Sequence, residues 1–419
     1  MVDTNSWMGK IPSNWRISKI GNAYTARNEK VSDLDYPPLS VTMKGVVPQL
    51  ATAAKSDDHN NRKLVKKGDF CINSRSDRRG SCGISPCDGS VSLINTVLEP
   101  RVEMVPEYYE WLFHTSQFAD EFYKWGHGIV DDLWTTGWSE MKRILIPVPQ
   151  VNEQIMIANY LRIQCGEIDS AIKKATESIE DFKELKHSVI QKVVTKGLRI
   201  DEEKQDSGIE WIGEMPASWR TAKISQVGAT SSGATPLRLR EDEYFTDASI
   251  PWVRTLDLND GLVYESSEKI TEAALQSASC SIMPAKTVCV AMYGGAGTIG
   301  KCGLLMNPAT TNQAICSIVC DENIMVPEFL LFQLLALRKY WMKYAVGTRK
   351  DPNISQEVVR RMKVVVPSIS EQKDIVAYLI LKVGEIDALI NEKTALLEDL
   401  VLYKKSLIYE IVTGKQPVI

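Results

Sequence analysis

The amino-acid sequence contains an internal repeat, and this feature constrains the fold more than any other. Residues 146–195 align with residues 364–413 without a gap, and 20 of the 50 aligned positions are identical. A tryptophan-containing marker is repeated upstream, where residues 7–16 match residues 211–220. Self-similarity of this kind indicates a duplicated structural unit. The sequence therefore predicts two similar frames in tandem that hold dissimilar inserts, which suits a molecule that reads two different things at a fixed separation.

The repeated segments have the pattern of helices. Gly166 and Gly384 are expected to end a short first helix in each copy. The second helix of each copy should then run for about 28 residues, or about 42 Å at 1.5 Å per residue. Its apolar residues recur at steps of three and four, which is the spacing of a coiled-coil seam. The expected pairing residues are Ile168, Ile172, Ile179 and Phe182 in the first copy, and Ile386, Ile390, Leu397 and Leu400 in the second.

Neither helix can bury its apolar face alone, so we expect the two to pair as an antiparallel coiled coil. Leu389, Leu396 and Tyr403 are expected to widen the apolar face of the second helix. Lys186 and Lys404 interrupt the seam at equivalent positions. Two interpretations remain open: either their stems pack while the ammonium groups reach water, or the lysines set the pairing register.

The segments between the repeats have the pattern of mixed α/β domains, with short apolar or β-branched stretches between turn residues. A shared Val-Pro-Glu sequence at Val105 and at Val326 should begin one helix in each, with proline in the first turn. The predicted fold is α+β: two α/β domains alternate with two long paired helices in a pseudo-twofold repeat. The expected boundaries are 1–148, 149–207, 208–366 and 367–419.

Charge and composition exclude several classes of protein. The net charge is −4, and residues 1–148 carry 18 basic and 18 acidic side chains, so DNA binding by general phosphate attraction should be weak without a partner. No apolar run reaches the roughly 18 residues of a membrane helix, and we expect a cytoplasmic protein with no membrane partner. None of the nine cysteines forms a Cys-x-x-Cys pair. Buried free thiols, especially near Cys289 and Cys316, are therefore expected, and no metal site.

Residues 295–301 imitate two nucleotide-binding motifs. Gly295 to Gly300 satisfies G-x-G-x-x-G, and Lys301 completes the glycine and lysine spacing of a P-loop. Both motifs require a helix directly after the glycines, because its N-terminus holds the phosphates. The next residues have the pattern of a strand, and Cys302 replaces the serine or threonine that binds Mg²⁺. We expect a glycine-rich turn, no cofactor and no catalytic residues.

Basic and aromatic loop residues are the candidates for DNA contact. Arginine beside small polar residues suits bidentate contact with guanine and anchoring to phosphate, although a single arginine of this kind can equally be a solvated surface charge. The stronger argument is that residues 75–79 and 293–297 should occupy corresponding loops but differ completely in sequence. The candidates are Arg75, Ser76, Arg78, Arg79 and His127 in the first domain, and Thr235, Arg238, Arg254, Tyr293, Thr348, Arg349 and Lys350 in the second.

Taken together, these motifs resemble those of the specificity subunits of type I restriction-modification systems. The resemblance covers nearly the whole chain. It rests on Trp211–Pro216 with Trp219, Gly233–Pro236, Ile250–Val253, and the paired Pro-x-x-x-Glu-Gln…Gly-Glu-Ile-Asp segments that begin at Pro149 and Pro367. The first domain departs from the pattern, since it has neither the Gly-x-Thr-Pro loop nor the Ile-Pro-Trp-Val strand.

The resemblance implies a non-catalytic subunit with two target-recognition domains, each of which reads one half of a bipartite site in double-stranded DNA. The paired helices would set the gap between the half-sites and dock two methyltransferase subunits, which methylate adenine with S-adenosylmethionine. Restriction subunits that use ATP and Mg²⁺ would join them. The alternatives are a coiled-coil scaffold that does not bind DNA, and a nucleotide-dependent enzyme that uses the turn at 295–301.

Overall fold

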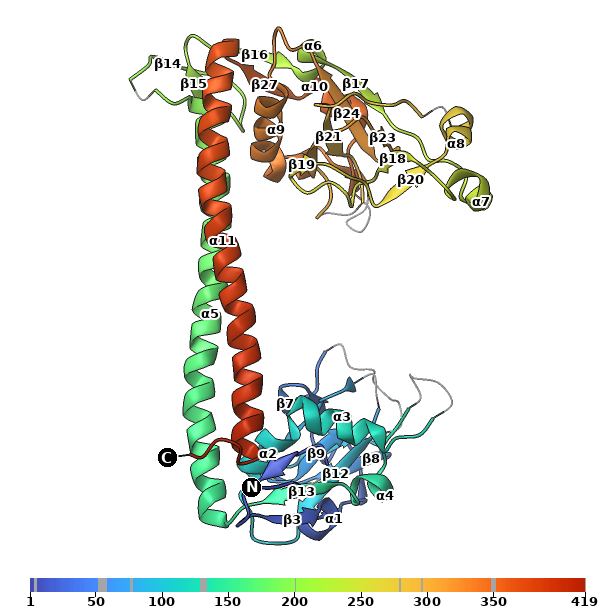
Figure 1. Ribbon diagram of the computed structural model, residues 1–419, viewed down its shortest axis with the longest axis vertical. Coiled ribbons are helices and arrows are strands. Elements are labelled where there is room, and N and C mark those ends of the chain that lie inside the picture. The colour runs from blue at the N-terminus through green and yellow to red at the C-terminus, as the bar shows by residue number, and fades with distance from the viewer. Residues whose placement is uncertain are drawn as a thin grey trace. The chain divides into compact units, whose positions relative to one another are not determined.

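The computed structural model describes residues 1–3, 6–51, 59–75, 78–128, 134–199, 201–278, 280–294, 297–347 and 352–418. The chain divides into two units. Unit 1 comprises Met1–Thr176 and Thr394–Ile419, and unit 2 comprises Glu177–Lys393. Each unit contains one α/β domain and one segment from each of two long helices, α5 (Val151–Lys196) and α11 (Ile369–Val412) (Figure 1). The predicted α+β fold class is therefore confirmed.

The domain of unit 1 is built on a four-stranded sheet of order β10-β9-β12-β4, beside a three-stranded sheet of order β11-β8-β5. Smaller pairs are β1–β2, β3–β13 and the hairpin β6–β7. The strands are β1 (Val2–Asp3), β2 (Lys10–Ile11), β3 (Arg16–Lys19), β4 (Tyr24–Ala26), β5 (Lys30–Val31), β6 (Leu39–Thr42), β7 (Gly45–Pro48), β8 (Arg62–Val65), β9 (Phe70–Asn73), β10 (Cys82–Ile84), β11 (Gly89–Ser92), β12 (Asn95–Pro100) and β13 (Leu145–Val148). The short helices are α1 (Ile20–Ala23), α2 (Pro106–Phe113), α3 (Ser116–Lys124) and α4 (Trp138–Met141).

The domain of unit 2 is built on a five-stranded sheet of order β17-β24-β21-β22-β19, beside a three-stranded sheet of order β20-β18-β23. The strands are β14 (Lys204–Asp206), β15 (Glu214–Pro216), β16 (Arg220–Lys223), β17 (Gly228–Ser232), β18 (Ile250–Val253), β19 (Gly261–Val263), β20 (Glu268–Ile270), β21 (Val288–Ala291), β22 (Cys302–Leu305), β23 (Thr310–Thr311), β24 (Ile315–Cys320), β25 (Val346–Gly347), β26 (Pro352–Asn353) and β27 (Lys363–Val366). The helices are α6 (Ile224–Val227), α7 (Glu241–Tyr244), α8 (Glu272–Ser277), α9 (Pro327–Ala336) and α10 (Gln356–Arg361), with 3-10 turns η3 (Arg238–Arg240), η4 (Leu337–Lys339) and η5 (Trp341–Lys343).

The central sheets of the two domains have the same strand order. The order β10-β9-β12-β4 in unit 1 corresponds to β22-β21-β24-β17 in unit 2, with antiparallel pairing throughout. Helices α2 and α9 begin at Pro106 and Pro327, as the shared Val-Pro-Glu sequence predicts. The duplicated frame predicted from the repeat is therefore present, with its inserts built on matching strands.

The expected breaks at Gly166 and Gly384 are wrong. Helix α5 is continuous for 46 residues and α11 for 44. A glycine inside a helix costs about 1 kcal/mol relative to alanine. Burial of one leucine or isoleucine contributes about 1.5–3 kcal/mol, and Leu161 and Ile168 on either side of Gly166 are both buried. Tertiary packing therefore outweighs the local preference of glycine.

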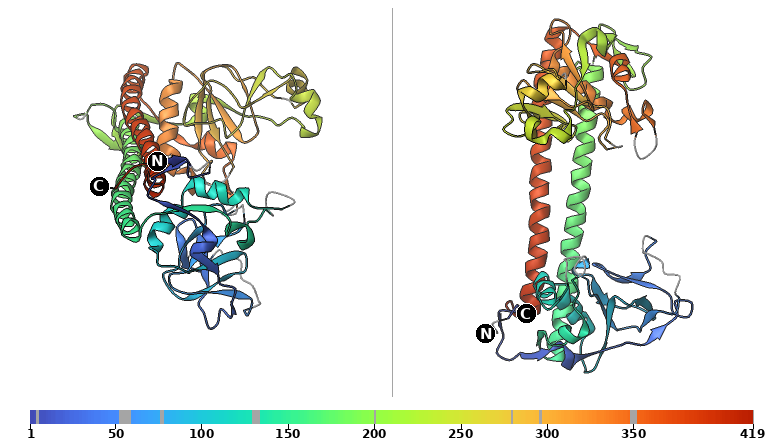
Figure 2. Two further views of the ribbon diagram at one scale, coloured as in Figure 1. Left: turned by 60° about the horizontal axis from the view of Figure 1, so that its bottom comes forward. Right: turned by 90° about the vertical axis from the view of Figure 1, so that its right-hand side faces the viewer.

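The two helices pair antiparallel, as predicted (Figure 2). Lys404 contacts Asp169 in unit 1 at 2.6 Å, and Lys186 contacts Asp387 in unit 2 at 2.8 Å. The partner's residue number thus falls as the number along α5 rises. Of the predicted pairing residues, Ile168, Ile179 and Ile386 are buried, and Ile172, Phe182, Ile390, Leu397 and Leu400 are half-buried.

Two further expectations for the helices are settled by the contacts. Lys186 and Lys404 do not merely extend into water, because each ammonium group binds a carboxylate of the opposite helix. The expectation that Leu389, Leu396 and Tyr403 widen the paired face is wrong, since they are 41%, 45% and 56% exposed. They lie on the side of α11 that α5 does not cover.

Identical residues of the repeat attach each domain to its helix segment. Gln154 accepts from the backbone N–H of Val105 at 2.9 Å, and Gln372 accepts from that of Val326 at 2.8 Å. Each glutamine amide also donates to the carbonyl of the proline five residues earlier. The indole N–H groups complete the attachment: Trp15 to Glu153, Trp219 to Glu371, Trp7 to the Leu145 carbonyl and Trp211 to the Lys363 carbonyl. The repeated sequence therefore supplies the hydrogen bonds that attach each α/β domain to its helix segment.

Candidate nucleic-acid interface

The first residues of the two loops predicted to correspond, Arg75 and Tyr293, stand at equivalent positions in the structure. Arg75 follows β9 and forms an isolated β-bridge with Thr135, while Tyr293 follows the equivalent strand β21 and forms one with Asn353. The two bridges are therefore the same feature of the frame. A different side chain, arginine or tyrosine, stands at the same place in each domain.

A second equivalent position lies beside the first. The turn before β12 carries Leu93, and the turn before β24 carries Gln313. Matching strand registers and matching backbone hydrogen bonds, Ser74 N–H to Ile94 and Met292 N–H to Ala314, establish the equivalence. At both equivalent positions, the two domains therefore carry side chains of different chemical type.

In unit 1, Arg75 lines a hollow of about 450 Å³. The floor carries Lys63, whose ammonium group donates to the Asn95 carbonyl at 2.7 Å and whose pKa is lowered by burial. Leu93 and Ile94 give the hollow an apolar side. It can therefore accept a group that is negative at one edge and apolar at another.

The other candidates of unit 1 surround Arg75. Arg79 forms an ion pair with Asp120 and lies over the Tyr123 ring at 5.6 Å. Arg78 is exposed, as is His127, whose backbone exchanges hydrogen bonds with Thr135. Ser76 lies outside the described residues. The structure thus brings the described candidates of unit 1 into one loop region, with the charge of Arg79 already compensated.

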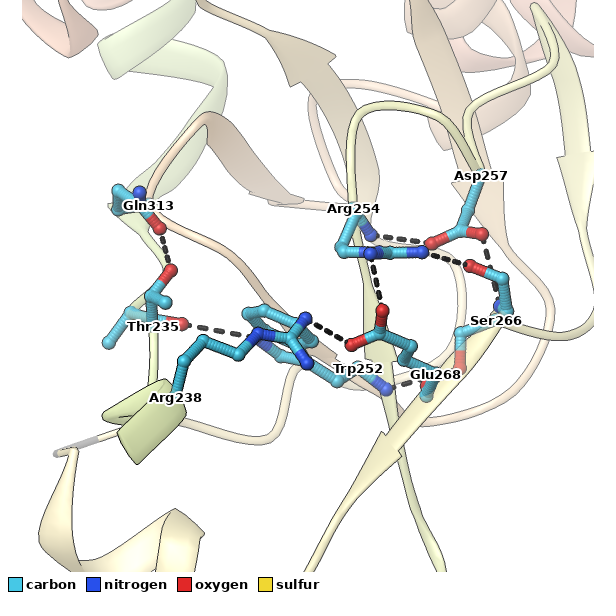
Figure 3. A network of polar contacts seen from close by, with 10 residues as sticks. Thr235, Arg238, Trp252, Arg254, Asp257, Ser266, Glu268 and Gln313 are labelled. Carbon is cyan, nitrogen blue, oxygen red and sulfur yellow. Dashed lines mark hydrogen bonds and ion pairs between the residues drawn. The ribbon is translucent and has the colours of Figure 1, made fainter. Parts of the chain in front are cut away.

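In unit 2, the Gly-Ala-Thr-Pro loop is fixed by close backbone contact. A Cβ atom at Gly233 would stand 1.9 Å from the Thr311 carbonyl oxygen, so only glycine fits there. Ala234 donates its N–H to Thr311 at 3.1 Å and accepts from the Trp252 indole at 3.1 Å. These bonds hold Thr235 against Gln313, to whose side-chain oxygen the threonine hydroxyl donates (Figure 3).

Glu268 binds two candidate arginines of unit 2, Arg238 and Arg254 (Figure 3). One carboxylate oxygen binds Arg254 at 2.5 Å, and the other binds Arg238. Arg238 also stacks over Phe245 at 4.3 Å, and Arg254 donates to Ser267 at 2.9 Å. One carboxylate thus neutralises part of the charge of two guanidinium groups and fixes their positions.

The remaining sequence candidates of unit 2 divide into two groups. Tyr293 is half-buried; burial raises its pKa, and a hydrogen bond with the Gln313 side chain acts in the opposite direction. Thr348, Arg349 and Lys350 lie outside the described residues. Tyr293, Thr235 and Gln313 therefore form one cluster, and Arg238, Arg254 and Glu268 form a neighbouring one.

The described part of the glycine-rich segment, residues 297–301, forms a turn that leads into a strand. Strand β22 begins at Cys302, where either nucleotide-binding motif would need a helix. Arg338 donates to the Gly297 carbonyl at 2.9 Å and pairs with Asp260. The described residues of this turn thus serve packing, as the strand-like pattern after the glycines indicates.

Sequence reasoning missed Gln313 and Glu268. Glu268 has no local signal, because its role comes from pairing between β20 and β18. Gln313 is the polar tip of a turn before a predicted strand, and its equivalence to Leu93 is visible only from strand register.

The comparisons with known proteins address the origin of this frame. A family model described as the type I restriction modification DNA specificity domain matches residues 216–399. The MjaVIII specificity subunit of a type I restriction enzyme, from Methanocaldococcus jannaschii, is 23% identical over 97% of this chain and 94% of its own length. Over nearly its whole length, the chain is therefore similar to the specificity subunits of type I restriction-modification systems.

Further members of this family match in part. The MjaIX specificity subunit of the same organism is 30% identical over 40% of this chain, and the EcoR124I/EcoR124II specificity subunit of Escherichia coli is 27% identical over 43%. These alignments span 38% and 43% of the two relatives.

Solved structures of the family share the fold. A chain from a type I R-M system, described for its complex assembly and conformational transition, has a TM-score of 0.76 at 15% identity and covers 97% of this chain and all of that one. The HsdS subunit from Thermoanaerobacter tengcongensis has a TM-score of 0.52 at 15% identity and covers 97% and 98%. Across the described residues, no helix has the length and apolar character needed to cross a membrane.

Proposed function

We propose that this chain is the DNA-specificity subunit of a type I restriction-modification complex, and that each α/β domain reads one half of a bipartite site. The observation that supports the proposal is that equivalent loop positions carry different side chains in the two domains. Arg75 and Leu93 in unit 1 stand where Tyr293 and Gln313 stand in unit 2. Two recognition domains built on the same scaffold need this arrangement. The repeated hydrogen bonds hold each domain in place, while the variable loop side chains select different bases.

The proposed contacts of the first half-site are Arg75, Ser76, Arg78, Arg79 and His127. For the second they are Thr235, Arg238, Arg254, Tyr293, Thr348, Arg349 and Lys350. Arg238 and Arg254 also pair with Glu268, which leaves each guanidinium fewer free donors but fixes its position for contact with DNA. The chain carries out no chemistry in this proposal and needs no cofactor. It acts in the cytoplasm, where partner subunits bring S-adenosylmethionine, ATP and Mg²⁺.

A repeated groove supports two identical methyltransferase partners. In unit 1, the start of α2 and one face of α5 enclose about 890 Å³. In unit 2, the start of α9 and the equivalent face of α11 enclose about 410 Å³. Asn159 and Ala377 occupy the same repeat position in the two grooves. Because two equivalent surfaces suit two copies of one partner, the grooves are the proposed docking places of the methyltransferase subunits. Restriction subunits join that assembly.

Docking is tested by stoichiometry. Asn159→Arg and Ala377→Arg place a bulky charge in one groove each, and native mass spectrometry counts the methyltransferase subunits bound to the complex. We expect two with the wild type, one with either variant and none with both. Asn391→Arg is the matched control, on an exposed position of α11 outside the groove. Retention of two subunits by the double variant would contradict the proposed surface.

The function is tested by co-expressing the chain with its methyltransferase subunit and mapping adenine methylation across the host genome. A split motif with a constant unread gap is expected. An assembled complex that adds no methylation would favour a scaffold without DNA binding.

A further inference from the structure

Gln313 stands on a rigid turn with its side chain exposed. The turn joins β23 to β24 and is pinned by Asn312, whose N–H donates to the Val253 carbonyl at 3.0 Å. Asn312 also accepts from the N–H of Ala314 at 3.2 Å, and the Gln313 carbonyl accepts from Ser232 at 3.2 Å. The backbone is thus fixed on three sides, so the side chain has a defined starting point.

The side-chain amide of Gln313 is held by two neighbouring hydroxyl groups. Thr235 donates its hydroxyl to the amide oxygen, and Tyr293 hydrogen-bonds the same side chain. A glutamine amide has two acceptor lone pairs and two N–H donors. At least one acceptor lone pair and one N–H therefore remain for a ligand. The amide is thus held in place before any DNA arrives.

We infer that Gln313 reads an adenine of the second half-site in the major groove, an inference that rests on the proposed function. An acceptor beside a donor, as a glutamine amide presents them, matches the N6 amino group and N7 of adenine. The neighbouring arginines Arg238 and Arg254, which would favour guanine, are bound to Glu268. Gln313 is thus an exposed polar group that this cluster of unit 2 holds in place.

The frame explains why the same reading does not occur in unit 1. Leu93 occupies the equivalent position and has no hydrogen-bonding group. An apolar side chain there can contact a thymine methyl group but cannot read adenine. Substitution of Gln313 should therefore change one base position of one half-site only.

The experiment uses the full chain assembled with its methyltransferase subunit, with genome-wide adenine methylation as the readout. Gln313→Ala should lose about 5- to 150-fold of the discrimination at one adenine position of the second half-site. Gln313→Glu has the same shape but offers two acceptors, so its preference should move toward cytosine, whose N4 amino group is a donor. The first half-site and the gap should not change in either variant.

Gln226→Ala is the matched control, because Gln226 is an exposed glutamine of the same domain that precedes β17, at the end of the strand away from Ser232. It should leave both half-sites unchanged. The inference is overturned if the wild-type second half-site contains no adenine besides the methylated one, or if both Gln313 variants keep the wild-type motif. Absence of any motif from the assembled wild-type complex would instead overturn the proposed function itself, and this inference with it.

Discussion

Lys186 lies with its ammonium nitrogen 2.8 Å from both carboxylate oxygens of Asp387. The repeat relates this pair to Lys404 and Asp169, at 2.6 and 2.7 Å, because both residues shift by 218 positions. Each helix therefore supplies one lysine and one aspartate, and the pairs form only when the two helices meet in one register. This geometry favours the interpretation of the lysines as register-setting residues.

The register interpretation predicts measurable coupling. A double-mutant cycle on Lys186→Ala and Asp387→Ala should give about 0.2–1 kcal/mol, the range for partly exposed ion pairs. Charge reversal of both residues together should recover most of the loss. Lys183→Ala is the control, since Lys183 pairs with Glu180 of its own helix. Urea unfolding measures each free energy, and a coupling of zero would leave the lysines as simple solvated stems.

The paired helices predict a ruler. One helical turn, four residues, added near position 180 should lengthen the unread gap of the methylation motif. The antiparallel pairing requires a matching insertion in α11, so the sharper variant adds four residues after Thr176 and four after Lys393. Methylation mapping should show a longer gap and unchanged half-sites. An altered half-site, or a gap of the original length, would contradict the ruler.

The hydrogen bonds that attach the domain of unit 2 to its helix segment predict that substitution of Gln372 lowers the free energy of unfolding. Its side chain is fully buried and accepts from the Val326 N–H. Gln372→Leu should lower the free energy of unfolding by about 1–3 kcal/mol, because buried polar groups lose their partner. The exposed Asn391→Leu on the same helix should change it by less than about 0.5 kcal/mol. Thermal denaturation of both variants measures the two effects. Equal effects would show that Gln372 does not attach the domain to the helix.

The loop after β9 predicts first-half-site specificity. Arg75→Ala should relax one position of the first half-site, with about 1–3 kcal/mol less discrimination. Arg101→Ala is a control, since its guanidinium donates to the Gly21 carbonyl away from this loop. Methylation mapping distinguishes the two. If an exchange of the whole 75–79 loop leaves the first half-site as it was, the assignment of Arg75, Arg78 and Arg79 is wrong.

The buried thiols predict a pH dependence. Cys289 and Cys316 are buried, as the sequence predicts, and burial raises the pKa of each thiol to about 12. An unfolded thiol ionises near pH 8.5. Stability from these neutral thiols is therefore complete below about pH 8.5 and is lost as pH rises toward 12. Iodoacetamide at pH 8.5 should label the exposed Cys87 well before Cys289, as mass spectrometry can follow; equal labelling in the folded chain would contradict the burial.

Much of the fold could be predicted from the sequence because the duplication repeats the structural residues in two segments of the chain. The identity of Gln154 and Gln372 indicated the duplicated frame. The spacing of apolar residues by three and four positions indicated the helix-pairing seam through Ile168 and Ile386. The breaks expected at Gly166 and Gly384 failed because a local preference of about 1 kcal/mol is small beside packing along the whole helix. Among the proposed site residues, Thr235 was predicted from loop composition and Tyr293 from the expected correspondence of two loops, whereas Gln313 and Glu268 required strand register.

What the sequence by itself determined is therefore the duplication, the resemblance to type I specificity subunits and the apolar seam, each of which depends on residue type and spacing along the chain. The tertiary structure alone decided which side chains are neighbours across strands and helices. It joined Lys186 to Asp387, Arg254 to Glu268 and Thr235 to Gln313. The physical reason is that ion pairs and oriented amides depend on contacts of a few ångströms between residues far apart in sequence, which local propensity does not encode.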